Sequence, residues 1–359
     1  MLRPGSPTSC GAWGALRNMD AFAKLNAQER RIFFEGTATP RNMQGPIIEK
    51  DFWACWTLKA LFGLPTIGEH LIFKGGTSLS KVFKVIQRFS EDIDVSINRS
   101  FLGFGGENEP EAGKSAKEKR RRIEGLKASC QQKVARELLP ALKATIESRL
   151  NSGDGWSLRP DDDDPDRQTL LFEYPTSFPV ELGSYIRRAI KIEMGARSDH
   201  WPCETKSITP YVAEQFLKGF AQPSCAVKVL SVERTFWEKA TILHAEFYRP
   251  ADKAIPDRYS RHYCDFYELI RSGVSQSAIA KLELLARVVE HKSLFFKSSW
   301  SKCDAAGKGT LRIAPQESRE KALREDYARM QQMFFGTPPA FEDIIAVLKT
   351  WEADFNRKP

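Results

Sequence analysis

The stretch FKGGTSLSKVFKVIQRFSEDIDVSI, residues 73–97, constrains the fold more than any other part of the sequence. A short apolar run at 71–73 predicts a strand that leads directly into a pair of glycines. Apolar residues then recur at helical spacing, so a helix is predicted to follow, with Thr77 or Ser78 as its N-cap. The sequence therefore predicts a strand, a glycine turn and a helix in immediate succession.

A second strand is predicted at 92–97, DIDVSI, because polar and apolar residues alternate there. Its polar face carries Asp92 and Asp94, whose Cα atoms would be roughly 6.7 Å apart. Two ionised carboxylates this close repel each other unless a cation neutralises them. Mg²⁺ suits them because it prefers oxygen ligands and completes its shell with substrate phosphates. We therefore predict that Asp92 and Asp94 form a metal pair, although the same alternation is also common on merely solvated strands.

The glycine turn would supply the complementary half of such a site. Backbone N–H groups at a helix N-terminus attract phosphate, and the hydroxyl of Ser90 can donate either to a phosphate oxygen or within the strand start. The predicted nucleotide-binding residues are Gly75, Gly76, Thr77, Ser78, Lys81 and Ser90. Phosphate held by the turn and metal held by the aspartates is an arrangement suited to phosphoryl transfer.

Two further strands are predicted, at 169–174 and 188–194. Glu193, on the second of them, is a candidate third catalytic carboxylate that ligates the metal or accepts a proton. A surface pair with Lys191 is the competing prediction. The acidic run at 161–166 lacks the glycine and closing glutamate of a calcium-binding loop, so a solvated hairpin tip is predicted there.

Composition argues against several classes of protein. Seven scattered cysteines form no CxxC pair and five histidines form no HExxH motif, so neither a disulfide framework nor structural zinc is predicted. No apolar run approaches the roughly 20 residues of a membrane-spanning helix, and we expect a cytoplasmic protein without a membrane partner. The net charge of +8 favours polyanionic partners. Residues 113–150 hold eleven Lys or Arg against four Glu, typical either of a solvated helix face or of a helix that follows a nucleic-acid backbone.

The overall layout predicts a mixed α/β half followed by a mostly helical half. Residues 1–18 are expected to form a flexible leader, and Met19 is a possible start. The first domain is predicted to span 19–228 and the second, helical domain 229–359.

The motifs GGTSLSK and FSEDID, at this separation, resemble the signature of the AbiEii/AbiGii family. These are the nucleotidyltransferase toxins of type IV toxin–antitoxin systems, and they include the MenT toxins. The resemblance runs from about residue 46 to the C-terminus, with further landmarks IKIEM, SVERTFWEKATILH, HYCDFYELI, VVEHKSLFF and REDYARMQQMFF. It implies an α+β fold, in which a polymerase-beta-like nucleotidyltransferase domain with a mixed sheet precedes a mostly helical C-terminal domain.

The resemblance also implies an activity and its partners. It implies an enzyme that moves a nucleotide from an NTP, with Mg²⁺, onto an acceptor. In the better understood relatives that acceptor is the 3′ end of tRNA, and its modification stops growth. A possible cognate antitoxin and a part in phage defence are implied in the same way.

Five residues match the family's motifs. Ser90, Asp92 and Asp94 match FSxDID, Lys239 matches the lysine of TFWEK, and Asp265 matches the aspartate of YCDFYEL. The resemblance implies that Lys239 reaches the nucleotide's phosphates, and that Asp265 orients Lys239 or contacts the nucleotide. From pattern alone, a lysine at the edge of an apolar stripe usually extends to solvent, and an aspartate opening a helix usually pairs with the helix dipole.

The leading hypothesis is an Mg²⁺-dependent nucleotidyltransferase that adds NMP to the 3′ end of an RNA, tRNA in the first instance, and acts as a toxin. One alternative is transfer to a protein or a small molecule. The other is a non-catalytic nucleotide-binding module, against which the intact Asp92 and Asp94 argue.

Overall fold

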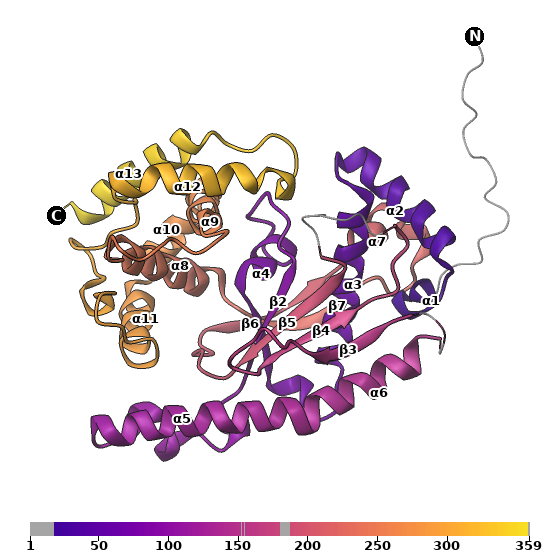
Figure 1. Cartoon of the computed structure of the whole chain (residues 1–359), viewed down its shortest axis with the longest axis horizontal. Coiled ribbons are helices and arrows are strands. Elements are labelled where there is room, and N and C mark those ends of the chain that lie inside the picture. The colour runs from indigo at the N-terminus through magenta and orange to yellow at the C-terminus, as the bar shows by residue number, and fades with distance from the viewer. Residues whose placement is uncertain (1–17, 152, 154, 180–186, 358–359) are drawn as a thin grey trace, which may run out of the picture.

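A computed structural model describes residues 18–151, 153, 155–179 and 187–357. The predicted leader therefore lies, except for its last residue, outside the described residues. A seven-stranded sheet forms the centre of the molecule, with strand order β3-β4-β5-β2-β1-β7-β6 (Figure 1). The strands are β1 (Leu71–Lys74), β2 (Asp92–Ile97), β3 (Ser157–Pro160), β4 (Thr169–Glu173), β5 (Ala189–Gly195), β6 (Cys203–Ile208) and β7 (Cys225–Leu230).

The sheet is mixed, as predicted. β2 runs parallel to β5 and β1 parallel to β7, while the other neighbouring pairs are antiparallel. Four of its strands match predicted segments, and β3, β6 and β7 were not predicted. β3 and β6 are the two edge strands, and edge strands tolerate the proline and the polar residues that weaken their sequence pattern.

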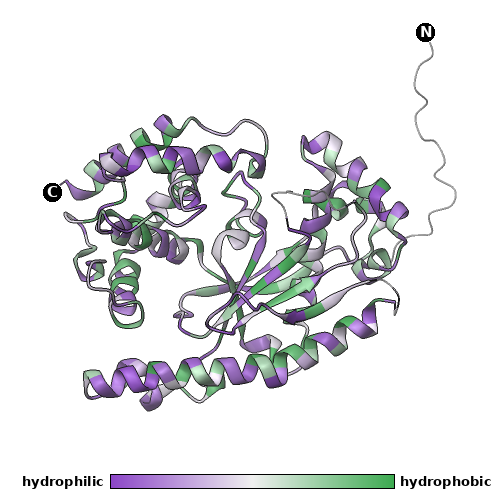
Figure 2. Cartoon of the chain, in the orientation of Figure 1, coloured by the Kyte–Doolittle hydropathy of each residue, from purple (hydrophilic) through white to green (hydrophobic). Residues whose placement is uncertain are grey.

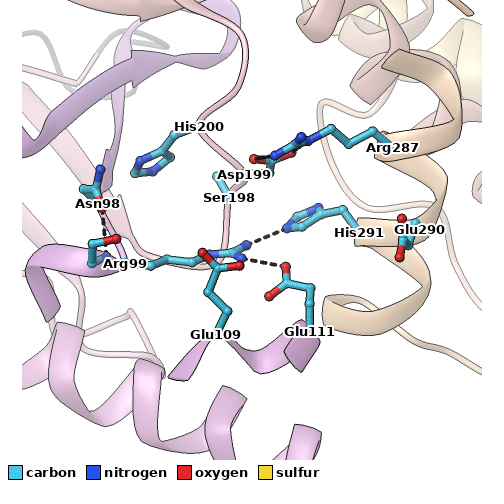
Figure 3. Close-up of a pocket in the computed structure, with 11 residues that line it drawn as sticks. Asn98, Arg99, Glu109, Glu111, Ser198, Asp199, His200, Arg287, Glu290 and His291 are labelled. Atoms are coloured by element: carbon cyan, nitrogen blue, oxygen red, sulfur yellow. Dashed lines mark hydrogen bonds and ion pairs between the residues drawn. The ribbon is translucent and has the colours of Figure 1, made fainter. Parts of the chain in front are cut away.

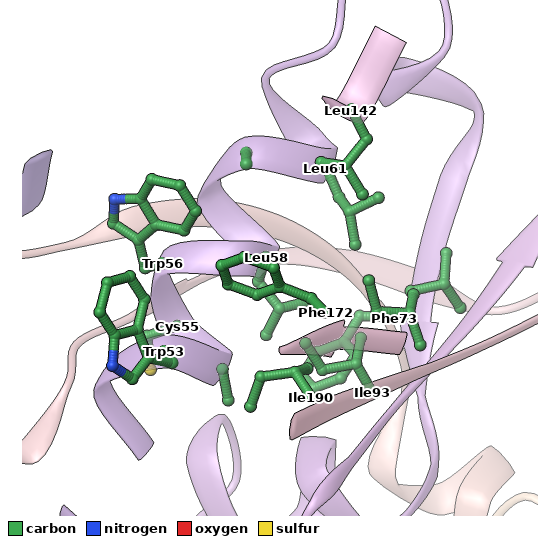
Figure 4. Close-up of a cluster of buried hydrophobic side chains, with 14 of the residues drawn as sticks. Trp53, Cys55, Trp56, Leu58, Leu61, Phe73, Ile93, Leu142, Phe172 and Ile190 are labelled. Carbon is green, nitrogen blue, oxygen red and sulfur yellow. The ribbon is translucent and has the colours of Figure 1, made fainter. Parts of the chain in front are cut away.

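The N-terminal helices and the sheet share one apolar core. Helix α3 (Gly45–Phe62) is buried over most of its length, and Trp53 and Trp56 pack against Phe172 of β4 (Figure 4). The apolar face of β2, with Ile93 among its residues, lies in the same cluster. Helices α1 (Met19–Ala23), α2 (Ala27–Arg41) and α7 (Tyr211–Gln215) lie at the same end of the molecule (Figure 1).

A long rod runs along the lower side of the sheet in Figure 1. It consists of α5 (Ala116–Lys133), a π-helical turn (Val134–Leu138) and α6 (Leu139–Arg149). Pro140 lacks an N–H group to donate into the helix, which accounts for the local change of hydrogen-bond pattern. The α5 part of the rod is mostly hydrophilic and extends beyond the sheet (Figure 2).

The C-terminal part is helical from Val232 onwards. It comprises α8 (Val232–Phe247), α9 (Ser260–Arg271), α10 (Val274–Ile279), α11 (Leu282–Phe295), α12 (Glu317–Arg329) and α13 (Phe341–Asn356). These helices bury their own cluster, which also takes in Leu79 of α4 (Gly75–Lys81) and Ile86 of the loop after it. The division at residue 229 stays a prediction, and the last strand of the sheet ends at Leu230. None of the helices in the described part of the chain is long and apolar enough to cross a membrane.

The helix after the glycine turn differs from its prediction. Helix α4 covers Gly75–Lys81, with Lys74 as its N-cap, so Thr77 and Ser78 are internal residues and the predicted N-cap was wrong. The chain leaves the helix after Lys81, and Lys84 adopts a left-handed backbone conformation with φ of 55°. The apolar residues beyond this point therefore pack from a loop and not from a helix.

Candidate active site

Strand register places a row of polar side chains across the middle of the sheet. Lys74 of β1 pairs in register with Asp94 of β2, Asp94 with Glu193 of β5, and Glu193 with Thr169 of β4. Residues directly opposite one another on neighbouring strands share a face of the sheet. Lys74 Nζ lies 4.0 Å from Asp94 Oδ1. The fold thus brings the predicted metal residue Asp94 beside the predicted third carboxylate Glu193.

Asp92 and Asp94 carry more negative charge than their surroundings neutralise. Burial raises the pKa of Asp92 to about 6, and Glu91, Glu193 and Asp94 add to the shift. Burial also raises the pKa of Asp94, where Lys74 opposes the shift and Glu193 adds to it. A bound cation would remove this repulsion.

The donor set fits a hard divalent cation. Asp92 and Asp94 offer carboxylate oxygens from one strand face, the ligands that Mg²⁺ prefers. Within the described residues, no group of three or more His, Cys, Asp or Glu side chains is arranged to hold a metal ion. Glu193 Oε1 instead lies 2.7 Å from Lys191 Nζ, the competing pair. A metal at the two aspartates would therefore complete its shell with water or substrate oxygens.

Glycine is required at positions 75 and 76 because neighbouring side chains of the site leave no room for a Cβ atom there. Gly75 has φ of +77°, and a Cβ at that position would collide with Asp94 Oδ2. A Cβ on Gly76 would lie 2.7 Å from Ser90 Oγ and 3.2 Å from an amino group of Arg88. The glycine turn therefore sits directly against Asp94, Ser90 and Arg88, and its backbone can approach a ligand there.

The two hydroxyls that follow the glycines are engaged within the protein. Thr77 Oγ1 donates to the carbonyl oxygens of Ser90 and Asp92, which ties α4 to the start of β2. Ser78 Oγ donates to the carbonyl oxygen of Gly75 at 2.7 Å. Both side chains are buried. Their part in nucleotide binding stays a prediction, whereas their part in shaping the turn is direct.

Lys81 does not point toward the aspartates. Its Nζ lies 2.7 Å from Asp51 Oδ1 and 3.6 Å from the ring centre of Tyr211, inside the protein. Contact with phosphate would require breaking this buried ion pair, which is costly because it leaves a charge unpaired. The structure thus gives Lys81 a structural partner in place of the phosphate expected from its position one turn into the helix.

Lys239 and Asp265, which are 26 residues apart in the chain, form a buried ion pair. Lys239 Nζ donates to Asp265 Oδ2 at 2.7 Å, and Arg88 binds both carboxylate oxygens at 2.7 and 2.8 Å. Burial alone would raise the pKa of Asp265, but Arg88 and Lys239 together hold it below its ordinary value. Asp265 therefore stays ionised and fixes two cations.

Two simple expectations for this pair were wrong. Asp265 lies in the middle of α9 and not at its start, so the helix-dipole role does not apply. Lys239 is buried, with a carboxylate as its partner, and does not extend to solvent.

A cavity of about 370 Å³ opens over the polar row. Lys74, Asp94, Lys191 and Glu193 form its floor, and the hairpin tip between β3 and β4 forms one wall. The prediction of a solvated tip is wrong for Asp161, which is buried and lies 4.0 Å from Lys191 Nζ.

Two more cavities adjoin this one, and Ser198 lines all three. The cavity in Figure 3 has a volume of about 310 Å³ and is lined mostly by charged and polar side chains. Arg99 binds Glu111 there at 2.7 Å, and Arg287 binds Asp199. Both arginines that line this cavity are therefore already bound to carboxylates.

Sequence reasoning missed three cations of this site. Arg88 contacts Asp265 and adjoins Gly76, Lys74 faces Asp94, and the charge of Arg261 on α9 lowers the pKa of Asp94. Lys74 and Arg88 stand within the 73–97 stretch, immediately before the glycines and two residues before Ser90, which was an available signal. Nothing in the local pattern marks Arg261.

Comparison with known proteins settles the family. A family model described as "Nucleotidyl transferase AbiEii toxin, Type IV TA system" matches residues 56–350. The chain belongs to this family. It is a nucleotidyltransferase of the AbiEii toxin family, and membership implies an NTP substrate and a cognate antitoxin.

Individual proteins add little to this assignment. No curated protein matches the chain. Among solved structures it is similar to MenT4, a nucleotidyltransferase toxin from Mycobacterium tuberculosis H37Rv, at 16% identity and a TM-score of 0.35. That match covers 84% of this chain and 98% of MenT4, and at this TM-score it supports no conclusion about the AbiEii site described above.

Replacing Gly75 with alanine should abolish nucleotide transfer, because the new Cβ would displace the Asp94 carboxylate. The matched control is Gly103→Ala. Gly103 also has a positive φ, +85°, but nothing lies within 4 Å of its would-be Cβ. Both variants should lose about 1 kcal/mol or more of unfolding free energy from backbone strain, measured by denaturant unfolding, and only Gly75→Ala should lose activity. Equal activity in the two variants would contradict the close approach.

Replacing Asp92 with asparagine should stabilise the protein at pH 7–8. The folded protein raises the pKa of Asp92 to about 6, so ionisation of Asp92 costs stability as the pH rises through 6. The gain in unfolding free energy should be on the order of 1–3 kcal/mol. It should vanish below about pH 4, where the carboxyl is protonated in both states.

The same variant tests the metal. Mg²⁺ should raise the melting temperature of the wild type at pH 8 and leave that of Asp92→Asn unchanged. Asp252→Asn, a change at an exposed residue, should behave as wild type in both experiments. A Mg²⁺ shift of equal size in Asp92→Asn would place the metal elsewhere.

Proposed function

We propose that this AbiEii protein is an Mg²⁺-dependent nucleotidyltransferase that transfers NMP from an NTP to the 3′ end of an RNA, tRNA in the first instance. The observation that carries the proposal is the row of Lys74, Asp94 and Glu193 directly beneath Gly75. Carboxylates that could hold a metal or accept a proton, and a lysine that could bind phosphate, are thus side by side on the sheet.

The reaction is a displacement at the α-phosphorus of the NTP. The oxygen of the acceptor hydroxyl forms a bond to that phosphorus, the bond to the bridging oxygen breaks, and pyrophosphate leaves. When bound at Asp92 and Asp94, Mg²⁺ would offset the negative charge of the phosphates. Glu193, in register with Asp94, is the group we assign to accept the hydroxyl proton, with Lys191 holding its carboxylate in place.

Two other predicted residues, Ser90 and Lys239, would act on the phosphates. Ser90, which adjoins Gly76, would donate its hydroxyl to a phosphate oxygen beside the backbone of the turn. Lys239 would offset charge on the leaving phosphates. Asp265 is a positioning residue in this scheme, because it holds Lys239 without facing a cavity. The architecture we infer is a polymerase-beta-like domain over 19–228 with a helical domain after it.

The biological setting follows from the same proposal. Transfer to the 3′ end of tRNA would block aminoacylation and stop growth, so the protein would act in the cytoplasm as a toxin restrained by its antitoxin. Phage defence is the setting that the family suggests.

Transfer of radiolabelled NMP from each of the four NTPs to total RNA tests the proposal directly. Wild type should label RNA in the size range of tRNA, and Asp94→Ala should label it at least a hundredfold less, because the metal pair is lost. The matched control, Asp252→Ala, removes an exposed carboxylate and should retain full activity. Equal labelling by wild type and Asp94→Ala would defeat the catalytic assignment, and labelled protein in place of RNA would favour the alternative acceptor.

Helix α5 is the surface we assign to the RNA backbone. Arg120 pairs with Glu124 and Arg122 with Glu118, whereas Lys117 and Arg121 are exposed one helical turn apart. The rod that carries them projects past the sheet (Figure 1).

Changing Lys117 and Arg121 together to glutamine should weaken RNA binding several-fold at low salt. It should also reduce the slope of log affinity against log salt by about 1.5, the value for two phosphate contacts. The control, Lys308→Gln with Lys321→Gln, removes two exposed charges from the C-terminal part, and α12, which carries Lys321, lies at the opposite side of the molecule (Figure 1). Salt slopes that are unchanged in both variants would remove α5 as the RNA track.

A further inference from the structure

A third cavity, of about 410 Å³, lies between the sheet and the C-terminal helices. It shares Lys74, Ser198 and Phe296 with the cavity over the catalytic row, so the two spaces are neighbours. Lys74 connects them directly, because its Nζ lies 4.0 Å from Asp94 Oδ1. A ligand held at the aspartates can therefore extend into this third cavity. Its volume lies within the range that binds small organic ligands.

The walls of this cavity combine aromatic rings with a few polar groups. Tyr259, Phe296 and Trp300 contribute rings, and Ile242 and Ala245 of α8 contribute apolar surface. Arg249 lies 4.9 Å from the ring centre of Trp300. Such walls suit a flat heterocycle, because base–aromatic stacking does not depend on charge.

Lys292 of α11 is, with Lys74, one of the two lysines that line this cavity. Its Nζ donates to the carbonyl oxygen of Glu238 at 3.0 Å, and the carboxylate of Glu238, which also lines the cavity, is paired with Arg234. Burial lowers the pKa of Lys292 to about 8, and the charges of Arg234 and Lys239 contribute. Lysine has three N–H donors, and one is used here. The remaining donors can meet an acceptor atom of a ligand.

The other two cavities do not offer this combination. The cavity over the row is lined largely by charged groups, among them Asp94 and Glu193, and both arginines that line the cavity of Figure 3 are already bound to carboxylates. An NTP has one apolar, planar part and one anionic part. The aromatic cavity suits the first, and the glycine turn with its aspartates suits the second.

We propose that the aromatic cavity receives the nucleoside of the incoming NTP, with the base against Trp300 and Tyr259 and an acceptor atom of the base bound by Lys292. The proposal rests on the proposed function, because it assumes that an NTP is the substrate. It makes Lys292 and Trp300 binding residues for the base, separate from the groups that act on the phosphates.

The test compares the binding of NTPs and of tripolyphosphate to the full-length protein by titration calorimetry in Mg²⁺. Lys292→Met and Trp300→Ala should each raise the Kd for the preferred NTP about tenfold or more. Ala245→Phe, which fills the cavity from α8, should do the same. All three should bind tripolyphosphate as wild type does, because that ligand has no base.

Lys297→Met is the matched control, since Lys297 is an exposed lysine five residues further along the chain. It should bind both ligands as wild type does, and melting temperatures identify any variant that fails to fold. Unchanged NTP affinity in Lys292→Met and Ala245→Phe would overturn the base pocket, as would an equal loss of tripolyphosphate binding. A wild type that binds no NTP would instead refute the proposed function itself, together with the pocket.

Discussion

Repulsion between the neighbouring carboxylates of Asp92 and Asp94 is the constraint on which the rest of the site depends. The opposite face of β2 is locked into the apolar core, so the strand cannot rotate to release either side chain to solvent. The backbone of Gly75 closes over Asp94 from above. The fold thus holds negative charge that its own groups neutralise only in part. Binding of a divalent cation there would remove the repulsion and would be favourable in free energy.

The charges around Asp265, in contrast, are balanced within the protein. Asp265 is buried and fully neutralised by Arg88 and Lys239, so it has no need of a ligand. Its contribution is geometric, because Arg88 precedes β2 and Lys239 belongs to α8. One carboxylate therefore fixes the positions of two cations that come from different layers of the molecule. This contact aligns the segment that leads into β2 with helix α8.

The sequence predicted the local unit well and its long-range contacts poorly. The alternation in 92–97 was sufficient to predict β2 and to place Asp92 and Asp94 on one face of it, because both are determined by neighbours in the chain. Lys81 was misjudged, since its partner Asp51 is 30 positions away and no local pattern reveals it. The cations facing Asp265 and Asp94 depend on tertiary packing in the same way. The edge strands β3 and β6 were not predicted, because an edge strand tolerates many side-chain patterns.

The ion pairs of Asp265 also bear on how the molecule holds together. Cutting the chain after the last strand would separate the buried Arg88 guanidinium from the Asp265 carboxylate, which would keep only Lys239 on its own fragment. Leu79 and Ile86 would lose their packing at the same cut. We therefore expect the sheet and the C-terminal helices each to be less stable when separated than they are in the whole chain.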